Sequence, residues 1–325
     1  MYWRASSQVR DHIQTPRSFR FTKLIAKTQQ IVARSIDLPR ICTLISLIIL
    51  LSTSIIIILS VLRNCAVPAR PSQERILDNI NLKPDIIARL INLNRQFYQT
   101  FGVNFSRTRQ RLQPGVMQIL EELEPSANIL DLGCGNGELA RALVERGHRG
   151  TYTGLDFSLP LLDEAVQSIS EGLEATFLQA DLSIPDWDSS IPKITIDITL
   201  AFAVLHHLPG EQLHKQVLTK IHTLLEPEGR FIHSEWQFMN SPRLRGRVQP
   251  WETIGLTNSD VDRGDYLLDW RHGGYGLRYV HHFDKNELTT LAEETGFTIL
   301  NTFYADGEGG RLGLYQIWEK ISKNI

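Results

Sequence analysis

Apolar and polar residues alternate with two different periods along most of this chain. From about residue 83 onward, short apolar runs typical of buried strands alternate with segments whose apolar residues recur every three to four positions, as on one face of a helix. This alternation predicts a sheet of parallel strands with helices on both faces. The region 83–325 is therefore expected to form one α/β domain.

The pattern predicts seven strands in this domain. They are expected at 128–132, 152–156, 175–180, 196–202, 230–235, 298–304 and 311–318. Helices are expected at 84–101, 114–124, 138–146, 160–170, 211–225 and 285–295. Residues 239–283 lie between the fifth and sixth strands, show no regular period and far exceed an ordinary connection, which predicts an irregular lid over the acceptor.

The lid carries residues that suit a nucleic acid base and its phosphates. Arg243, Arg245 and Arg247 lie within six residues of one another and are suited to phosphate or carboxylate. Aromatic side chains available for stacking on a base follow them, at Trp251, Trp270, Tyr275 and Tyr279. A solvated loop with buried aromatic anchors is the alternative interpretation.

The first 82 residues do not share this pattern. Residues 1–40 are a basic arm, 41–62 an uncharged apolar run, and 63–82 a polar linker. As a helix, the apolar run is long enough to cross a bilayer. Two other interpretations stay open: a wrongly assigned translation start, which would leave residues 1–66 outside the native protein, and an organelle transit segment.

Composition narrows the class further. The first 40 residues carry eight Lys and Arg against two Asp, so the remainder of the chain has a net charge of about −8. Proteins that grip long stretches of nucleic acid are usually basic, so any RNA is expected to meet local basic patches. Cys42, Cys65 and Cys134 are too few and too scattered for a disulfide framework, and no metal site is expected.

Candidate chemistry begins where the first predicted strand turns into its helix. Gly133, Gly135 and Gly137 let the backbone approach a ligand closely, and the helix that follows offers free N–H groups. The loop departs from the dinucleotide fingerprint because Glu138 stands where that motif has its third small residue. The sequence predicts a nucleotide-type cradle without a pyrophosphate site.

Three acids occupy the ends of consecutive predicted strands. Asp131 precedes the glycine loop, Asp156 closes the second strand, and Asp181 follows the third. The carboxyl ends of parallel strands line the crevice where open α/β sheets bind ligands. There Asp156 is expected to accept from ribose hydroxyls and Asp181 from an adenine amino group, although each acid alone is also common as a helix cap.

Together these segments resemble the class I S-adenosylmethionine-dependent methyltransferases. The resemblance implies a Rossmann-like seven-stranded sheet, mostly parallel with an antiparallel last strand, and S-adenosylmethionine as cofactor. It also implies that residues 201–208 line the transfer site. The cofactor-binding residues it implies are Asp131, Gly133, Cys134, Gly135, Asn136 and Gly137 for the methionine end, Asp156 and Phe157 for the ribose and adenosine, Asp181 and Leu182 for the adenine, and Phe202 and Ala203 near the methyl group.

Further segments resemble a subgroup that esterifies the carboxymethyl group of a tRNA wobble uridine. They are Tyr98, 105–109 and Pro114 before the first strand, and 264–270 and 278–283 in the lid. The match departs from the subgroup at two points: Asn104 replaces its usual His, and 110–114 lacks its Trp.

The acceptor determines which side chains would act. A carboxylate needs no base, and Arg109 or Arg278 is expected to hold it by a bidentate pair. An acceptor hydroxyl or ring nitrogen would give its proton to His206, His207 or His281.

Three functions stay open from the sequence. The first is an RNA methyltransferase, for which the resemblance implies tRNA and, in some members, a small activating subunit. The second is a small-molecule or lipid-quinone methyltransferase, favoured if 41–62 is a membrane helix, and the third is a catalytically silent partner subunit. The catalytic domain is expected in the cytoplasm, where S-adenosylmethionine is made, although a basic arm kept inside would place it across the membrane.

Overall fold

The computed structural model describes residues 82–107, 111–169 and 172–321. The basic arm, the apolar run 41–62 and all of the linker but its last residue lie outside the described residues. Within the described ranges, no helix is both long enough and apolar enough to cross a membrane.

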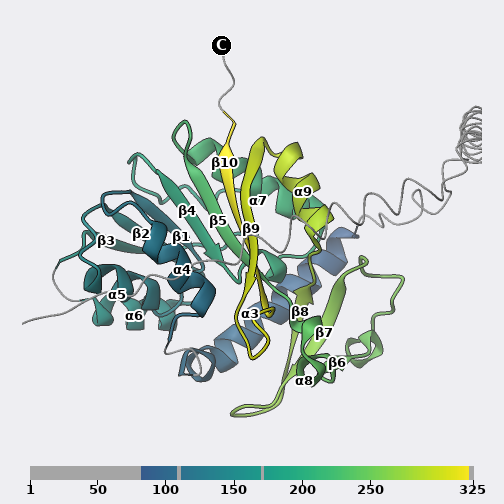
Figure 1. Ribbon diagram of the computed structural model, residues 1–325. Helices are drawn as coiled ribbons and strands as arrows, with labels where there is room; N and C mark the ends of the chain where they lie inside the picture. The colour runs from purple at the N-terminus through teal and green to yellow at the C-terminus, as the bar shows by residue number, and fades with distance from the viewer. Residues whose placement is uncertain (1–81, 108–110, 170–171, 322–325) are drawn as a thin grey trace, which may run out of the picture. The chain divides into compact units, whose positions relative to one another are not determined.

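A seven-stranded sheet forms the centre of the domain (Figure 1). Its order is β3 (Ala175–Gln179), β2 (Tyr152–Asp156), β1 (Ile129–Leu132), β4 (Ile198–Phe202), β5 (Arg230–Trp236), β10 (Gly313–Lys320) and β9 (Phe297–Ala305). The first five strands pair in parallel, and β10 pairs antiparallel with both β5 and β9. The expected mostly parallel sheet with an antiparallel last strand is confirmed.

Helices cover both faces of this sheet, as the two periods of the sequence predict. One face packs on α4 (Pro114–Glu122), α5 (Glu138–Glu145) and α6 (Leu159–Ser168), and the other on α7 (Glu211–Leu224) and α9 (Lys285–Glu294). The central strands β1, β2 and β4 are therefore buried on both faces, and ligands of the sheet are expected to enter at the ends of these strands.

The region 239–283 differs from its prediction, because it holds regular structure where an irregular stretch was expected. It contains α8 (Pro242–Arg245) and a separate antiparallel sheet of β6 (Val248–Gln249), β7 (Asp265–Trp270) and β8 (Gly276–His281). Both faces of β7 and β8 are largely buried, so their residues do not show the alternation of apolar and polar positions that marks a half-exposed strand.

Helix α3 (Pro84–Arg107) extends six residues beyond its predicted end and runs beside β8 (Figure 1). Its Asn94 is buried and pairs with the backbone of Tyr279 in β8, accepting from the N–H at 2.8 Å and donating to the carbonyl at 3.1 Å. The same amide donates to the carbonyl of His207 at 3.0 Å. One side chain thus joins a helix, the small sheet and the loop that follows β4.

Asn94→Ala is expected to destabilise the domain by about 2–4 kcal/mol, because it leaves buried backbone groups at Tyr279 without their partner. Urea unfolding followed by circular dichroism measures the change. Gln96→Ala, at an exposed position two residues along α3, is the control and should lie within about 0.5 kcal/mol of the native chain. Equal stability of the two variants would contradict this account of Asn94.

Candidate functional site

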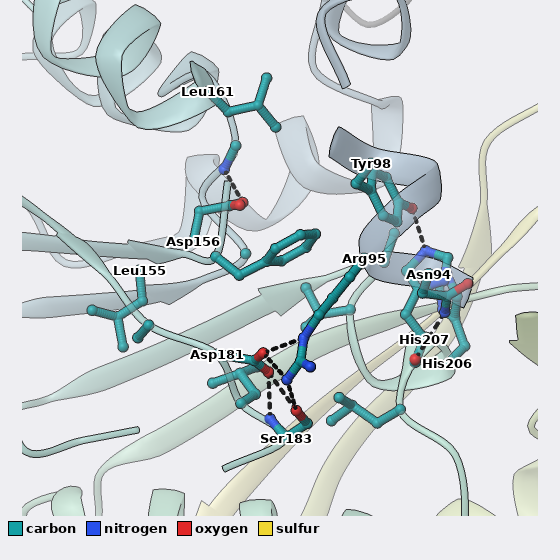
Figure 2. Close-up of a pocket in the computed structure, with 18 of the residues that line it drawn as sticks. Asn94, Arg95, Tyr98, Leu155, Asp156, Leu161, Asp181, Ser183, His206 and His207 are labelled. Atoms are coloured by element: carbon teal, nitrogen blue, oxygen red, sulfur yellow. Dashed lines mark hydrogen bonds and ion pairs between the residues drawn. The ribbon is translucent and has the colours of Figure 1, made fainter. Parts of the chain in front are cut away.

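A cavity of about 250 Å³ lies at the carboxyl ends of the parallel strands, and α3 forms one of its walls (Figure 2). The strand ends contribute Gly133 after β1, Asp156 at the end of β2, Asp181 after β3 and Phe202 at the end of β4. This is the crevice in which sheets of this topology bind their ligands. The structure thus brings two of the three predicted strand-end acids, Asp156 and Asp181, around one space.

The glycine loop has the backbone conformation that its sequence predicts. Gly133, Gly135 and Gly137 have φ values of 72°, 56° and 77°, in the left-handed region. A Cβ on Gly133 would lie 2.7 Å from a methyl carbon of Val204, whereas a Cβ on Gly135 would meet no heavy atom within 4 Å. Gly135 therefore faces open space at the cavity wall, as a loop that cradles a ligand requires.

Asp156 connects the second strand to this loop. Its side-chain oxygens accept from the backbone N–H of Gly135 at 3.0 Å and of Ser158 at 2.8 Å. Burial raises the pKa of Asp156, although hydrogen bonds from the backbone of Ser158, Gly135 and Phe157 oppose the shift. A carboxylate has about four acceptor positions, so at least one remains for a ribose hydroxyl. Phe157 follows at the cavity wall, 5.9 Å from the ring of Tyr98.

Asp181 is engaged by a helix that the sequence does not connect to it. One of its oxygens accepts from the Nε and Nη2 of Arg95 at 2.8 and 2.5 Å, and the other from the backbone and hydroxyl of Ser183 at 2.9 and 2.6 Å (Figure 2). Burial raises the pKa of Asp181, but these hydrogen bonds outweigh it and hold the pKa below its usual value. All four acceptor positions are occupied, so an adenine amino group can bind here only if a protein donor leaves.

Asp131 lines a second, adjoining cavity of about 230 Å³. It accepts from the hydroxyl of Tyr152 at 2.6 Å, and burial raises its pKa to about 7. The two cavities are adjacent, because they share wall residues. The residues common to both are Gly133, Asn136, Phe202, Ala203 and Trp236.

The remaining predicted cofactor residues have varied surroundings. Cys134 is buried at the second cavity, and burial raises the pKa of its thiol. Asn136 donates to the Ser106 hydroxyl at 2.8 Å, and Leu182 lines the first cavity beside Asp181. Ala203 has a φ of 60°, which is strained for a residue with a side chain, and its N–H donates to the carbonyl of Ser234 at 3.0 Å.

Both predicted histidines after β4 line the first cavity. His206 Nδ1 lies 2.9 Å from Glu235 Oε2, and His207 Nε2 lies 2.8 Å from the hydroxyl of Tyr98 on α3. The two rings are 4.4 Å apart. Both side chains are thus held by side chains from other elements at the edge of a ligand-sized space.

Arg278 reaches the same cavity from β8. Only 4% of the residue is exposed, and its guanidinium lies over the rings of Trp236, Phe97 and Trp270 at 4.8, 5.4 and 5.9 Å. Burial lowers the pKa of Arg278, Tyr98 raises it, and the charge of Arg247 lowers it further. The cavity wall therefore holds the buried cation of Arg278 among aromatic rings, and the charge of Arg247 lies near it.

One predicted residue, His281, lies outside this assembly. His281 lines neither cavity; its ring nitrogens lie 2.6 Å from Asp265 and 2.8 Å from Glu287, joining β8 to α9. Burial lowers its pKa, but these two acids prevail and raise the pKa to about 10. Arg109 lies outside the described residues.

Sequence reasoning missed Arg95, Trp236 and Glu235. Arg95 lies three residues before the motif residue Tyr98 on the same helix, so the two side chains share a face. This spacing is the one sequence signal that could have placed Arg95 at the site. Trp236 and Glu235 end the fifth strand, where a position beside the ligand follows from the topology.

Comparison with known proteins finds methyltransferases. A family model described as a methyltransferase domain matches residues 105–302. A demethylmenaquinone methyltransferase of Thermotoga maritima is 27% identical over 69% of this chain and 87% of its own length. A tRNA (carboxymethyluridine(34)-5-O)-methyltransferase of Schizosaccharomyces pombe is 25% identical over 64% of this chain and 90% of its own length.

A similar fold is found in a solved structure, a 1,6-didemethyltoxoflavin-N1-methyltransferase of Burkholderia thailandensis with bound S-adenosylhomocysteine. It has a TM-score of 0.52 and 21% identity, covering 76% of this chain and 94% of that one. The comparisons give no support for membrane attachment or for a small activating subunit.

Asp156→Ala is expected to weaken the binding of S-adenosylhomocysteine by about 30-fold or more, since it removes the acceptor for the ribose and the anchor of Gly135. Isothermal titration calorimetry measures the dissociation constant. Asp163→Ala, at an exposed position on α6, should leave it unchanged. An unaltered affinity in Asp156→Ala would remove the ribose assignment.

Arg95→Ala is expected to tighten the binding of the same ligand by about threefold to tenfold, because it frees one oxygen of Asp181 for the adenine amino group. The affinities of 7-deaza- and N6-dimethyl-adenine analogues provide the comparison, since only the second lacks the amino donor. If Arg95→Ala weakened binding equally for both analogues, the guanidinium would be a ligand contact and not a competitor.

Proposed function

This chain belongs to the methyltransferase-domain family, and we propose that it methylates a carboxylate carried on a planar base, the carboxymethyl group of a tRNA wobble uridine. S-adenosylmethionine supplies a methyl group that its sulfonium already makes electrophilic. The protein's task is then to hold the acceptor oxygen in line and to exclude water. The observation that carries the proposal is the buried guanidinium of Arg278.

Arg278 favours an anionic acceptor for an electrostatic reason. A cation buried among rings loses hydration, and an entering carboxylate would compensate its charge through charge-assisted hydrogen bonds. The neighbouring charge of Arg247 adds to the same positive potential. A carboxylate bound here needs no proton acceptor, so positioning alone would suffice for transfer.

The surroundings of Arg278 suit a flat base. Trp236 lines both cavities and lies at the end of β5, next to the strand end that carries Phe202. Trp270 and Phe97 lie edge to face, 5.9 Å apart, beside the same guanidinium. Aromatic faces of this kind stack on bases that are turned out of a loop.

The region 239–283 is proposed as the acceptor lid, since it supplies both Arg278 and an outer basic surface. Arg243 and Arg245 are exposed on α8, and Arg247 is partly exposed beside it. These side chains are placed to meet RNA phosphates while Arg278 meets the carboxylate. The relative that acts on carboxymethyluridine in tRNA supports this acceptor.

The cofactor is proposed to lie across the strand ends. Asp156 would hold the ribose, Phe157 would pack on the adenosine, and Asp181 with Leu182 would border the adenine. The glycine loop leaves room for the methionine end at Gly135, with Asp131 beneath it. In this proposed pose the methyl group would lie near Phe202 and Ala203, which line both cavities.

A small aromatic molecule is the second candidate acceptor. His206 beside Glu235 offers a proton acceptor at the cavity wall, which a hydroxyl or ring nitrogen would use. The similarity to a demethylmenaquinone methyltransferase supports this class. The alternative of a catalytically silent subunit has no observation in its favour. The described residues form a cavity, and its wall holds both Arg278 and His206.

Arg278→Lys is expected to lower kcat/KM for methyl transfer to tRNA bearing the carboxymethyl group by at least about 30-fold, because a buried charged contact is worth about 2–5 kcal/mol. The assay follows tritium from labelled S-adenosylmethionine into tRNA and its loss on mild alkali, as an ester requires. Arg271→Lys, an exposed guanidinium paired with Asp269, is the control and should act like the native chain.

The affinity for S-adenosylhomocysteine should be the same in Arg278→Lys and in the native chain, since Arg278 is proposed to meet the acceptor alone. Label that resists alkali, or label found only in a small-molecule extract, would contradict the ester-forming assignment. A loss of cofactor affinity equal to the loss of rate would contradict the proposed role of Arg278.

A further inference from the structure

Three buried side chains form a chain of hydrogen bonds that begins at the cavity wall. His206 Nδ1 lies 2.9 Å from Glu235 Oε2, and Glu235 Oε1 lies 3.0 Å from His233 Nδ1. At most 1% of each residue is exposed. The proposed cofactor and acceptor contacts involve Glu235 only as a neighbour of His206 and do not involve His233.

The surroundings of His233 fix the position of its proton. Its ring stacks on Phe231 with the centroids 4.9 Å apart and an interplanar angle of 8°, and it forms a T-shaped pair with Trp318 at 4.6 Å. Its Nε2 is buried without a hydrogen-bond partner among the described residues. A buried N–H donor without an acceptor is costlier than a bare lone pair in an aromatic surround. The proton therefore belongs on Nδ1, which donates to Glu235.

This donor determines what Glu235 can do at its other oxygen. The carboxylate accepts a hydrogen bond from the Nδ1–H of His233 and another from the backbone N–H of His206. Burial raises the pKa of Glu235 well above its usual range, whereas the donated hydrogen bonds stabilise the ionised form. We take Glu235 as ionised, and its second oxygen can then only accept. His206 must then carry its proton on Nδ1, and the lone pair of its ring lies on Nε2.

We propose that His206 is a proton acceptor of this cavity, with Glu235 and His233 as positioning residues that hold its proton on Nδ1 and make Nε2 the basic nitrogen. The proposal rests on the second candidate acceptor of the proposed function, an aromatic hydroxyl, and deepens it by assigning positioning roles to Glu235 and His233. The hydroxyl proton passes to Nε2, the oxygen bonds to the methyl carbon, and the electron pair of the broken C–S bond stays on sulfur. The imidazolium then releases its proton to water.

Other charged groups face this arrangement from neighbouring elements. The ring of His207 is 4.4 Å from that of His206, and the N–H of Trp236 lies 3.4 Å from the same Nδ1. Burial raises the pKa of Glu235, the charge of His281 lowers it, and that of Glu287 raises it. The Trp236 contact would favour the opposite tautomer, but it is longer than the 2.9 Å contact with Glu235.

The tautomer of His206 can be read directly in the full-length chain without cofactor. Long-range ¹H–¹⁵N correlation spectra of ¹⁵N-histidine-labelled protein distinguish Nδ1–H from Nε2–H, and His206→Gln assigns the signals. We expect Nδ1–H in the native chain. An Nε2–H tautomer there would overturn the proposal, whatever the variants do.

Glu235→Gln provides the sharpest variant. His233 would keep donating to the carbonyl oxygen of the new side-chain amide, so the NH₂ of that amide would turn toward His206 and force its proton to Nε2. His233→Phe should shift His206 partway, and His233→Asn, which can still donate, should restore the native pattern. His148→Asn, a buried ring bonded to the carbonyl of Ala127 and outside both cavities, is the control. An unchanged tautomer in Glu235→Gln would overturn the relay.

A matched pair of probes tests the chemical consequence. We expect Glu235→Gln to slow methylation of 2-naphthol by about 100-fold or more and that of 2-naphthoate by less than about threefold, because only the naphthol must lose a proton. Equal losses on both probes would reduce Glu235 to a structural role and overturn the proposal. If the native chain did not methylate the carboxylate of the tRNA but Glu235→Gln still slowed methylation of 2-naphthol selectively, only the proposed function would be contradicted. If the native chain methylates neither probe, the tautomer of His206 measured by NMR decides between support for the proposal and its rejection.

Discussion

The position of helix α3 at the wall of the first cavity depends on the hydrogen bonds of one amide, Asn94. Its side chain reproduces a peptide unit toward Tyr279 and reaches the carbonyl of His207 with the same nitrogen. These contacts hold α3 against both β8 and the loop after β4. Because α3 carries Tyr98 and Arg95, the position of this helix sets the hydroxyl beside His207 and the guanidinium on Asp181. A polar core contact thereby fixes the geometry of the site.

The predictable part of this protein is the part encoded by local pattern. The strand 152–156 was predicted with its observed bounds, and the glycine loop needed only its own sequence, because glycine adopts the three positive φ values without steric cost. The strand-end acids followed from the topology of parallel sheets. The fold and the cofactor crevice can thus be predicted from segments of a few residues, and each segment can be interpreted without knowledge of the others.

What could not be predicted depends on pairs of residues far apart in the chain. Arg95 and Asp181 are 86 residues apart, and nothing in either segment announces their contact. His281 fits a catalytic motif by sequence, yet Asp265 and Glu287 turn it into part of an interior charge network. The small sheet was missed because β7 is buried on both faces and so lacks the alternation of a half-exposed strand.

The two chemistries of the cavity wall follow from how each charge is compensated. The cation of Arg278 lies among aromatic rings and interacts with Tyr98, and an entering anion would compensate its charge directly. The negative charge assigned to Glu235 is met instead by donors from His206 and His233, inside the wall. Under the two proposals, a ligand would meet a cation that binds an anionic group and a basic nitrogen that accepts a proton. Acceptor choice then depends on which group the acceptor presents, while the cofactor end of the cavity stays the same.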